Sequence, residues 1–169
     1  GEVIRGTQSA KSLEEVKIIE PSSDRVHPPC SHFKTCGGCQ LQHASDEFVS
    51  SWKVAVVAQA LAAHGISTEL RACLTSPIAS RRRATFSARR TKKGATAGFH
   101  ARGSDVIVEI ANCQLLDADL VAALPIIEAF AVIGTSRKGK LSAQVTASQA
   151  GLDIAIEGGK MLDGPMHAR

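Results

Sequence analysis

The chain has 169 residues, a net charge of +4 and 44% apolar residues, which is typical of a folded globular protein. This length accommodates one ordinary domain or two small ones with a sizeable core. No apolar run is long enough for a membrane span, and the start lacks the pattern of a secretion signal. Five cysteines, three of them clustered, favour a metal site in a reducing compartment over a disulfide framework, so we expect a cytoplasmic protein.

The first elements expected along the chain are two short strands at residues 2–7 and 13–19. Two strands are marginally stable alone, so they either end a small β domain or pack against the next part of the chain. Farther on, Ser45 fits the N-cap of a helix and Gly65 fits its C′ position. The apolar stripe of this helix contains Phe48 and Trp52, which we expect to face a core.

Between the strands and the helix lies a cysteine-rich stretch that contains Cys30, Cys36 and Cys39. The two residues between Cys36 and Cys39 are glycines, which we expect to take positive φ and turn both sulfurs toward one metal. Cys113 can supply a fourth ligand once the chain folds back. Four thiolates around one point describe an iron–sulfur cluster or a structural zinc site.

The spacing of the cysteines does not decide between zinc and an iron–sulfur cluster. Zinc sites usually pair two Cys-x2-4-Cys knuckles, whereas one cysteine triplet with a remote fourth cysteine suits a cubane cluster. His32, His43 and His100 are reserve ligands for a zinc site. We expect Cys73, the fifth cysteine, to be a small buried hydrophobic residue.

The second half of the chain is rich in strand patterns. Apolar and polar residues alternate at 83–89 and again at 95–101, with a turn between them, and a β-branched run follows at 105–110. Residues 117–134 read as helical, but Pro125 should split the segment or open a second helix at its first turn. Residues 140–147 and 152–157 are expected to form a closing hairpin.

The positive charge is concentrated in one block. From Arg71 to Ser104 there are nine basic residues and no acidic ones, whereas the rest of the chain has eleven basic and sixteen acidic residues. This asymmetry favours a polyanion-binding face over an ordinary solvated face, although one side of the block could instead serve the fold through buried ion pairs. With 4% aromatic residues and no Tyr, binding through many stacked bases is disfavoured. The candidate RNA-binding residues are Arg81, Arg82, Arg83, Arg89, Arg90, Lys92, Lys93 and His100.

Several motifs together resemble one known family. They are Arg-Val-His-Pro-Pro-Cys at 25–30, Cys-Gly-Gly-Cys-Gln-Leu-Gln-His at 36–43, Trp52-Lys53, Arg-Arg-Arg-Ala at 81–84, Gly-Phe-His at 98–100 with Ser104, the segment 110–116 around Cys113, and Gly-Leu-Asp-Ile at 151–154. In combination these motifs resemble the iron–sulfur-containing RNA uracil-5-methyltransferases, which methylate uridine in 23S ribosomal or transfer RNA with S-adenosylmethionine.

The resemblance implies that Cys30, Cys36, Cys39 and Cys113 ligate a [4Fe-4S] cluster. It also implies an α+β fold in which residues 1–23 are the last strands of an OB-like TRAM domain. Residues 24–169 would then be a central RNA-binding domain, built on an antiparallel sheet with flanking helices and the cluster loop at 30–43. We expect the partner to be structured RNA, ribosomal rather than transfer, with no membrane contact, and the protein to be a monomer.

The chain departs from the family in the motifs that it lacks. It contains no strand–Gly-x-Gly–helix element for S-adenosylmethionine and no second cysteine motif for the catalytic nucleophile. The expectation is therefore a fragment that carries the cluster and part of the RNA surface, inactive by itself, whose parent transfers a methyl group to C5 of uridine. The alternative is a stand-alone zinc-stabilised RNA-binding module without catalytic activity.

Overall fold

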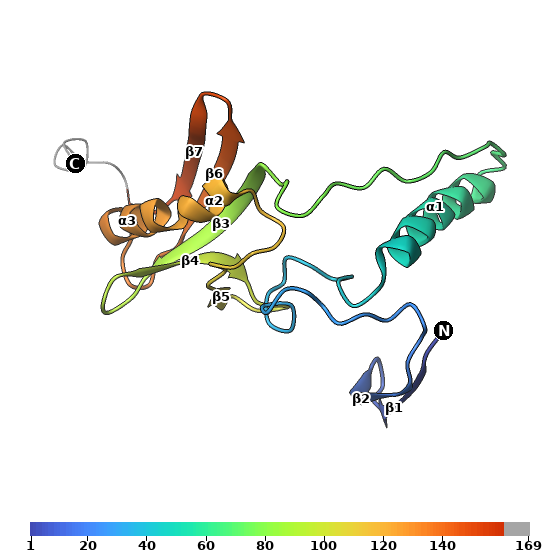
Figure 1. Cartoon of the computed structure of the whole chain (residues 1–169). Coiled ribbons are helices and arrows are strands. Elements are labelled where there is room, and N and C mark those ends of the chain that lie inside the picture. The colour runs from blue at the N-terminus through green and yellow to red at the C-terminus, as the bar shows by residue number, and fades with distance from the viewer. Residues whose placement is uncertain (161–169) are drawn as a thin grey trace. The chain divides into compact units, whose positions relative to one another are not determined.

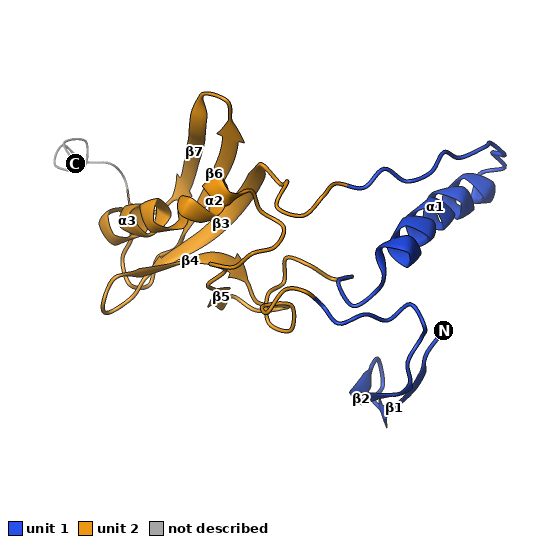
Figure 2. Ribbon diagram, in the orientation of Figure 1, with its two compact units in different colours: residues 1–28, 41–75 blue, residues 29–40, 76–169 orange. Residues whose placement is uncertain are grey.

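The computed structural model describes residues 1–160, which form two compact units (Figure 2). Unit 1 consists of Gly1–Pro28 and Leu41–Thr75, and unit 2 consists of Pro29–Gln40 and the chain from Ser76 onward. The end of the predicted second domain, residues 161–169, lies outside the described residues. Every buried side chain among residues 1–160 belongs to unit 2, which therefore contains the hydrophobic core. The assignment of residues 1–23 to a TRAM domain stays a prediction.

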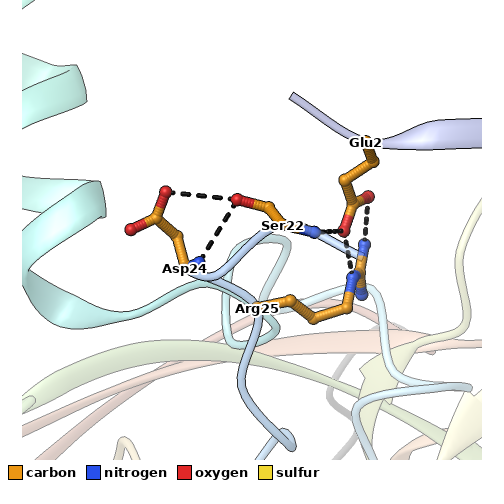
Figure 3. A network of polar contacts seen from close by, with 4 residues as sticks. All are labelled: Glu2, Ser22, Asp24 and Arg25. Atoms are coloured by element: carbon orange, nitrogen blue, oxygen red, sulfur yellow. Dashed lines mark hydrogen bonds and ion pairs between the residues drawn. The ribbon is translucent and has the colours of Figure 1, made fainter. Parts of the chain in front are cut away.

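Unit 1 begins with a two-stranded antiparallel hairpin, as the sequence predicts. It consists of β1 (Val3–Gln8) and β2 (Leu13–Glu20) (Figure 1). The segment that leaves the hairpin is tied to Glu2, the residue just before β1, whose carboxylate accepts hydrogen bonds from Nε and Nη2 of Arg25 and from the N–H of Ser22 (Figure 3). This bidentate pair holds the pKa of Glu2 at about 2, below its ordinary value of 4.5, chiefly because the Arg25 guanidinium donates to the ionised carboxylate.

The helix of unit 1, α1, spans Asp46–Ala63, and both predicted ends are confirmed. The Ser45 hydroxyl accepts a hydrogen bond from the Phe48 N–H at 3.2 Å, and Gly65 follows the helix with φ of +72°. The expectation that Phe48 and Trp52 face a core was wrong. α1 buries none of its side chains, and these two aromatic residues are 43% and 45% exposed.

Unit 2 is built on a five-stranded antiparallel sheet with the strand order β5-β4-β3-β6-β7 (Figure 1). The strands are β3 (Arg83–Arg90), β4 (Ala95–His100), β5 (Ile107–Val108), β6 (Leu141–Ser148) and β7 (Gly151–Gly158). β3, β4, β6 and β7 match the predicted strands, and β5 is shorter than expected. The expected α+β class with an antiparallel sheet is thus confirmed, while the TRAM and cluster assignments stay predictions.

Two short helices follow β5, and the predicted split at Pro125 is confirmed. α2 spans Ala118–Ala122 and α3 spans Leu124–Gly134, with Pro125 in the first turn of α3, where its missing N–H is not needed. α3 contacts β3 and β4, and α2 contacts β6, so both helices pack on one face of the sheet (Figure 1). Within residues 1–160, no helix has the length and apolar character needed to cross a membrane.

The alternation along the strands separates an apolar from a polar face. Phe86 of β3 pairs with Ala143 of β6, and both are fully buried in the core together with Ile127 of α3. The neighbouring residues Thr85 and Gln144 pair on the other side of the sheet. We call that side the polar face, which carries Arg83, Thr85, Ser87 and Arg89 of β3, Thr96, Gly98 and His100 of β4, and Ser142, Gln144 and Thr146 of β6.

The sheet is incomplete beside β4. β5 pairs with Phe99 and His100 alone, so the first part of β4 has no strand neighbour on that side among the described residues. A helix side chain supplies a contact there instead, because the Ala97 N–H donates to Oε1 of Glu128 in α3 at 3.2 Å.

Candidate functional site

The cysteine loop, Cys30–Cys39, packs against the end of β4. Within the loop, the Cys36 N–H donates to the His32 carbonyl at 2.8 Å and forms a tight turn. Cys36 also forms an isolated antiparallel bridge with Ala101, just after β4, and the Gly37 N–H donates to the His100 carbonyl at 2.8 Å. Main-chain contacts at Cys36 and Gly37, the start of the short segment between Cys36 and Cys39, therefore fix the loop to the sheet.

The two glycines of this gap are needed for close packing. A Cβ at Gly37 would lie 2.9 Å from the His100 carbonyl oxygen, and a Cβ at Gly38 would lie 3.3 Å from the Phe99 ring. The expectation of positive φ at these glycines was wrong, since neither is among the residues with positive φ. Their role is to let the loop approach the strand closely.

The structure brings the four predicted metal ligands into the same unit. Cys36 is 8% exposed, and its Sγ accepts a hydrogen bond from the Gly38 N–H at 3.4 Å. Cys113 follows the buried Ile110, to whose carbonyl its N–H donates at 3.0 Å, and its side chain packs against the core. The chain after Cys113 is tied to the start of the sheet by a bridge between Arg81 and Leu116.

Sharing a unit does not mean that the thiols meet. Among residues 1–160, no group of three or more His, Cys, Asp or Glu side chains is arranged to hold a metal ion. The donor chemistry suits an iron–sulfur or zinc centre, but coordination would require the thiols to gather as the metal binds, so that metal binding would be coupled to local ordering of the chain. The four-cysteine centre stays a prediction.

The remaining predicted ligands behave differently from one another. Cys73 lies in an irregular segment and is half-buried, so the expectation of a buried hydrophobic residue was wrong. Nε2 of His32 and Nδ1 of His100 are buried and make no hydrogen bond in the described residues. Nε2 of His100 lies 2.8 Å from the Ser87 hydroxyl, which fixes its ring on the polar face.

The predicted basic surface is exposed throughout. All seven of its arginines and lysines, Arg81, Arg82, Arg83, Arg89, Arg90, Lys92 and Lys93, are exposed. Within residues 1–160 the ion pairs are Arg25–Glu2 and Lys140–Asp105, so none of the seven cations is neutralised by a carboxylate. The alternative of buried ion pairs in this block is therefore wrong.

The seven cations do not all share one face. Arg83 and Arg89 lie on the polar face with His100, whereas Arg90 alternates to the other side at the end of β3. Lys92 and Lys93 lie in the β3–β4 turn, and Arg81 and Arg82 precede β3. Arg82 and Arg83 together line a cleft against the β6–β7 turn, with Thr146, Ala147, Ser148, Gln149 and Ala150.

The polar face is acidic at β7, so its cationic part does not extend to that strand. Thr146 of β6 pairs with both Arg83 of β3 and Asp153 of β7, which places the cation and the carboxylate two strands apart on one face. Glu157 of β7 occupies the same face opposite Ser142. Thr96 of β4 also donates to the Glu109 carboxylate at 3.4 Å, so an anionic ligand is expected over β3 and the β3–β4 turn.

Arg102 is the residue that sequence reasoning missed. It lines a second cleft, beside the cysteine loop, together with Gly37, Gly38, Gln40, Phe99, His100, Ala101 and Gly103. In the sequence it counts as one more cation of the basic block. Its proximity to a cysteine loop more than sixty residues earlier is a product of the tertiary fold.

Comparison with known proteins gives a consistent set of relatives. The chain is 39% identical over 171 aligned residues to an uncharacterized RNA methyltransferase of Caulobacter vibrioides, covering 99% of this chain and 41% of the relative. It is 34% identical to an uncharacterized RNA methyltransferase of Brucella suis, covering 96% of this chain and 40% of the relative. The 23S rRNA (uracil(1939)-C(5))-methyltransferase RlmD of Acinetobacter baylyi is 37% identical over 138 residues, which are 74% of this chain and 29% of that protein.

The matches extend over nearly all of this chain but only part of each relative. The chain spans about 40% of the length of the first two relatives. No family model matches the sequence.

Proposed function

We propose that the chain, which is similar to RNA methyltransferases over part of their length, is the cluster-bearing and RNA-recognising part of a uridine C5-methyltransferase acting on 23S ribosomal RNA. The proposal rests mainly on the 39% identity to an RNA methyltransferase over 99% of this chain. The finer assignment to uridine C5 is supported by the 37% identity to RlmD. In the whole protein, S-adenosylmethionine would supply the methyl group.

The metal part of the proposal is a [4Fe-4S] cluster held by Cys30, Cys36, Cys39 and Cys113. It is supported by the donor chemistry, by the confinement of all four cysteines to unit 2, and by the Gly38 N–H that already donates to the Cys36 sulfur. A cluster bound by all four cysteines would cross-link the loop to the segment after β5. Its free energy of binding would then stabilise the fold.

Metal content tests this assignment directly. The 169-residue chain is purified anaerobically and analysed for iron, acid-labile sulfide and zinc. About four iron and four sulfide per chain are expected for a cubane held by four cysteines. One equivalent of zinc without iron would instead support the zinc-stabilised RNA-binding module, and no metal in the fully reduced chain would refute the centre.

The RNA part of the proposal rests on exposed cations that no carboxylate of residues 1–160 neutralises. Lys92 and Lys93 in the β3–β4 turn, with Arg83 and Arg89 on the polar face, can contact phosphates from one side of the sheet. Such contacts give affinity with strong salt dependence and carry little sequence information. They would position the RNA, while the rest of the whole enzyme would perform the methyl transfer.

Salt-dependent binding tests the surface. Affinity for a 23S rRNA fragment containing the uracil 1939 named for RlmD is measured at increasing salt, with a transfer RNA as competitor. The double change Lys92→Ala and Lys93→Ala should weaken binding and lower the salt slope by about 1 to 2.

The matched control is Arg137→Ala with Lys138→Ala, which removes the same charge from an exposed segment after α3. This control should retain the slope of the unmodified chain. Equal loss in both variants would show a net-charge effect and refute a located surface. Stronger competition by transfer RNA than by the ribosomal fragment would overturn the choice of substrate.

A further inference from the structure

Arg102 makes more contacts with the cysteine loop than any role as a surface cation requires. Its Nη2 donates to the carbonyl oxygens of Phe33 and Cys39, both at 2.9 Å, and its Nε donates to that of Cys36 at 3.4 Å. The guanidinium carbon also lies 4.7 Å from the centre of the Phe33 ring. The Arg102 main-chain N–H donates to the Thr35 carbonyl at 3.2 Å.

These carbonyls belong to irregular backbone, where no helix or strand ladder supplies donors. Two of them are carbonyls of predicted ligand cysteines, Cys36 and Cys39, at either end of the glycine pair. Main-chain carbonyls need partners, and one side chain donates to three of them here. We propose that Arg102 is a positioning residue that clamps the main chain of the cysteine loop to the end of β4 before any metal binds.

The base of the clamp is itself fixed. Ala101, next to Arg102, bridges Cys36, and its N–H donates to the Val106 carbonyl at 2.8 Å. Gly103 then turns the chain with φ of +60°, which a glycine adopts without strain. The guanidinium therefore projects from a closed turn at the end of the sheet.

The contacts require an arginine. A guanidinium is a planar fork with five donors, so it can reach separate carbonyls and stack on an aromatic ring at once. A lysine ammonium is a compact charge on a flexible stem, and it cannot reproduce the fork and the stacking together. Arg102→Lys is therefore expected to behave like Arg102→Ala, although it keeps the charge.

The clamp would act by reducing the ordering that metal binding must impose on the loop. A loop whose main chain is already restrained loses less conformational freedom when the ligands close on the metal. This purpose rests on the proposed metal centre, whereas the clamp itself does not. The two can therefore be tested separately.

The clamp is tested by amide hydrogen exchange in the metal-free, reduced 169-residue chain. Arg102→Ala and Arg102→Lys should each raise exchange about tenfold at the Cys36 and Gly37 amides, a factor equal to about 1.4 kcal/mol. The amides of β3 and β6 should keep their rates. Arg137→Ala, which removes an exposed arginine elsewhere in unit 2, should leave every rate unchanged. Unchanged loop exchange, or an equal rise throughout the sheet, would overturn the clamp.

The link to metal binding is tested with Zn²⁺ as a thiol-binding probe, by measuring the rate at which the chain releases Zn²⁺ to a chelator. Arg102→Ala should release Zn²⁺ about tenfold faster than the unmodified chain and the Arg137→Ala control. If loop exchange rises but no variant binds Zn²⁺ or iron, the clamp stands and the proposed metal centre fails. If metal binds normally and neither exchange nor release changes, the metal centre stands and the clamp is refuted.

Discussion

Gly98 gives the sharpest prediction about the sheet, because main-chain atoms of Val108 in the neighbouring strand β5 lie close to it. A Cβ built at Gly98 would overlap the Val108 carbonyl oxygen and lie 2.9 Å from the Val108 carbonyl carbon. Both are main-chain atoms, so no side-chain rotation can relieve the contact. Gly98 is buried and does not have positive φ, so the cost of Gly98→Ala is purely steric.

The magnitude follows from overpacking a rigid site. Such substitutions cost about 1 to 3 kcal/mol, and because this contact is with the backbone we expect a cost of about 2 to 3 kcal/mol. For a unit of about 100 residues, each kcal/mol lowers the melting temperature by about 4 to 8 °C, so a fall of about 10 °C or more is expected. Because Val108 leads into Ile110 and Cys113, the metal content expected for the proposed four-cysteine centre should fall as well.

The assay is thermal unfolding followed by circular dichroism, with metal content measured on the same samples. Gly94→Ala in the β3–β4 turn is the control, since a Cβ there meets nothing within 4 Å. The control should melt within about 4 °C of the unmodified chain, as expected for a surface change within about 0.5 kcal/mol. Equal melting temperatures for the Gly98 and Gly94 variants would refute the close packing of β5 on β4.

Three further predictions concern single side chains. The pKa of Glu2 is about 2 in the folded chain and 4.5 ordinarily, so the pair with Arg25 contributes stability above pH 4.5 that is lost as the pH falls toward 2. Glu2→Gln should abolish this acid-dependent loosening of residues 1–25, read by NMR titration, and an unchanged titration would contradict the pairing. Ser45→Ala removes an N-cap worth about 1 kcal/mol and should lower the helix content measured by circular dichroism. The loss should be visible because α1 has no buried side chain to stabilise the helix in its place. An unaltered helix content would contradict the cap. Cys73→Ser should leave the metal-to-protein ratio unchanged whereas Cys113→Ser lowers it, and the reverse pattern would reassign the fourth ligand.

Local chemistry made much of the secondary structure predictable. Ser45, Gly65 and Pro125 act within a few residues of their own position, so their effects at helix ends could be inferred without the fold. The alternation in β3 likewise indicates which residues share a face, and the sheet confirms it.

Features that depend on distant contacts could not be predicted. The stripe on α1 shows that one side is apolar but not whether the chain buries it, and Phe48 and Trp52 are exposed. The cysteine spacing indicates thiolate chemistry without fixing where Cys113 lies relative to the loop. Arg102 was counted for its charge alone, because its carbonyl partners lie more than sixty residues away and come together with it only in the folded sheet.

The hydrogen bond from the Ala97 N–H to Glu128 has a consequence for self-association. An unpaired strand edge is a template on which another chain can add a strand. Among the described residues, β5 pairs only with Phe99 and His100, so the first part of β4 has no strand neighbour on that side. A carboxylate from α3 occupies a main-chain donor there and brings negative charge to the margin of the sheet. The helix thereby discourages edge-to-edge aggregation at a place where the sheet could otherwise grow.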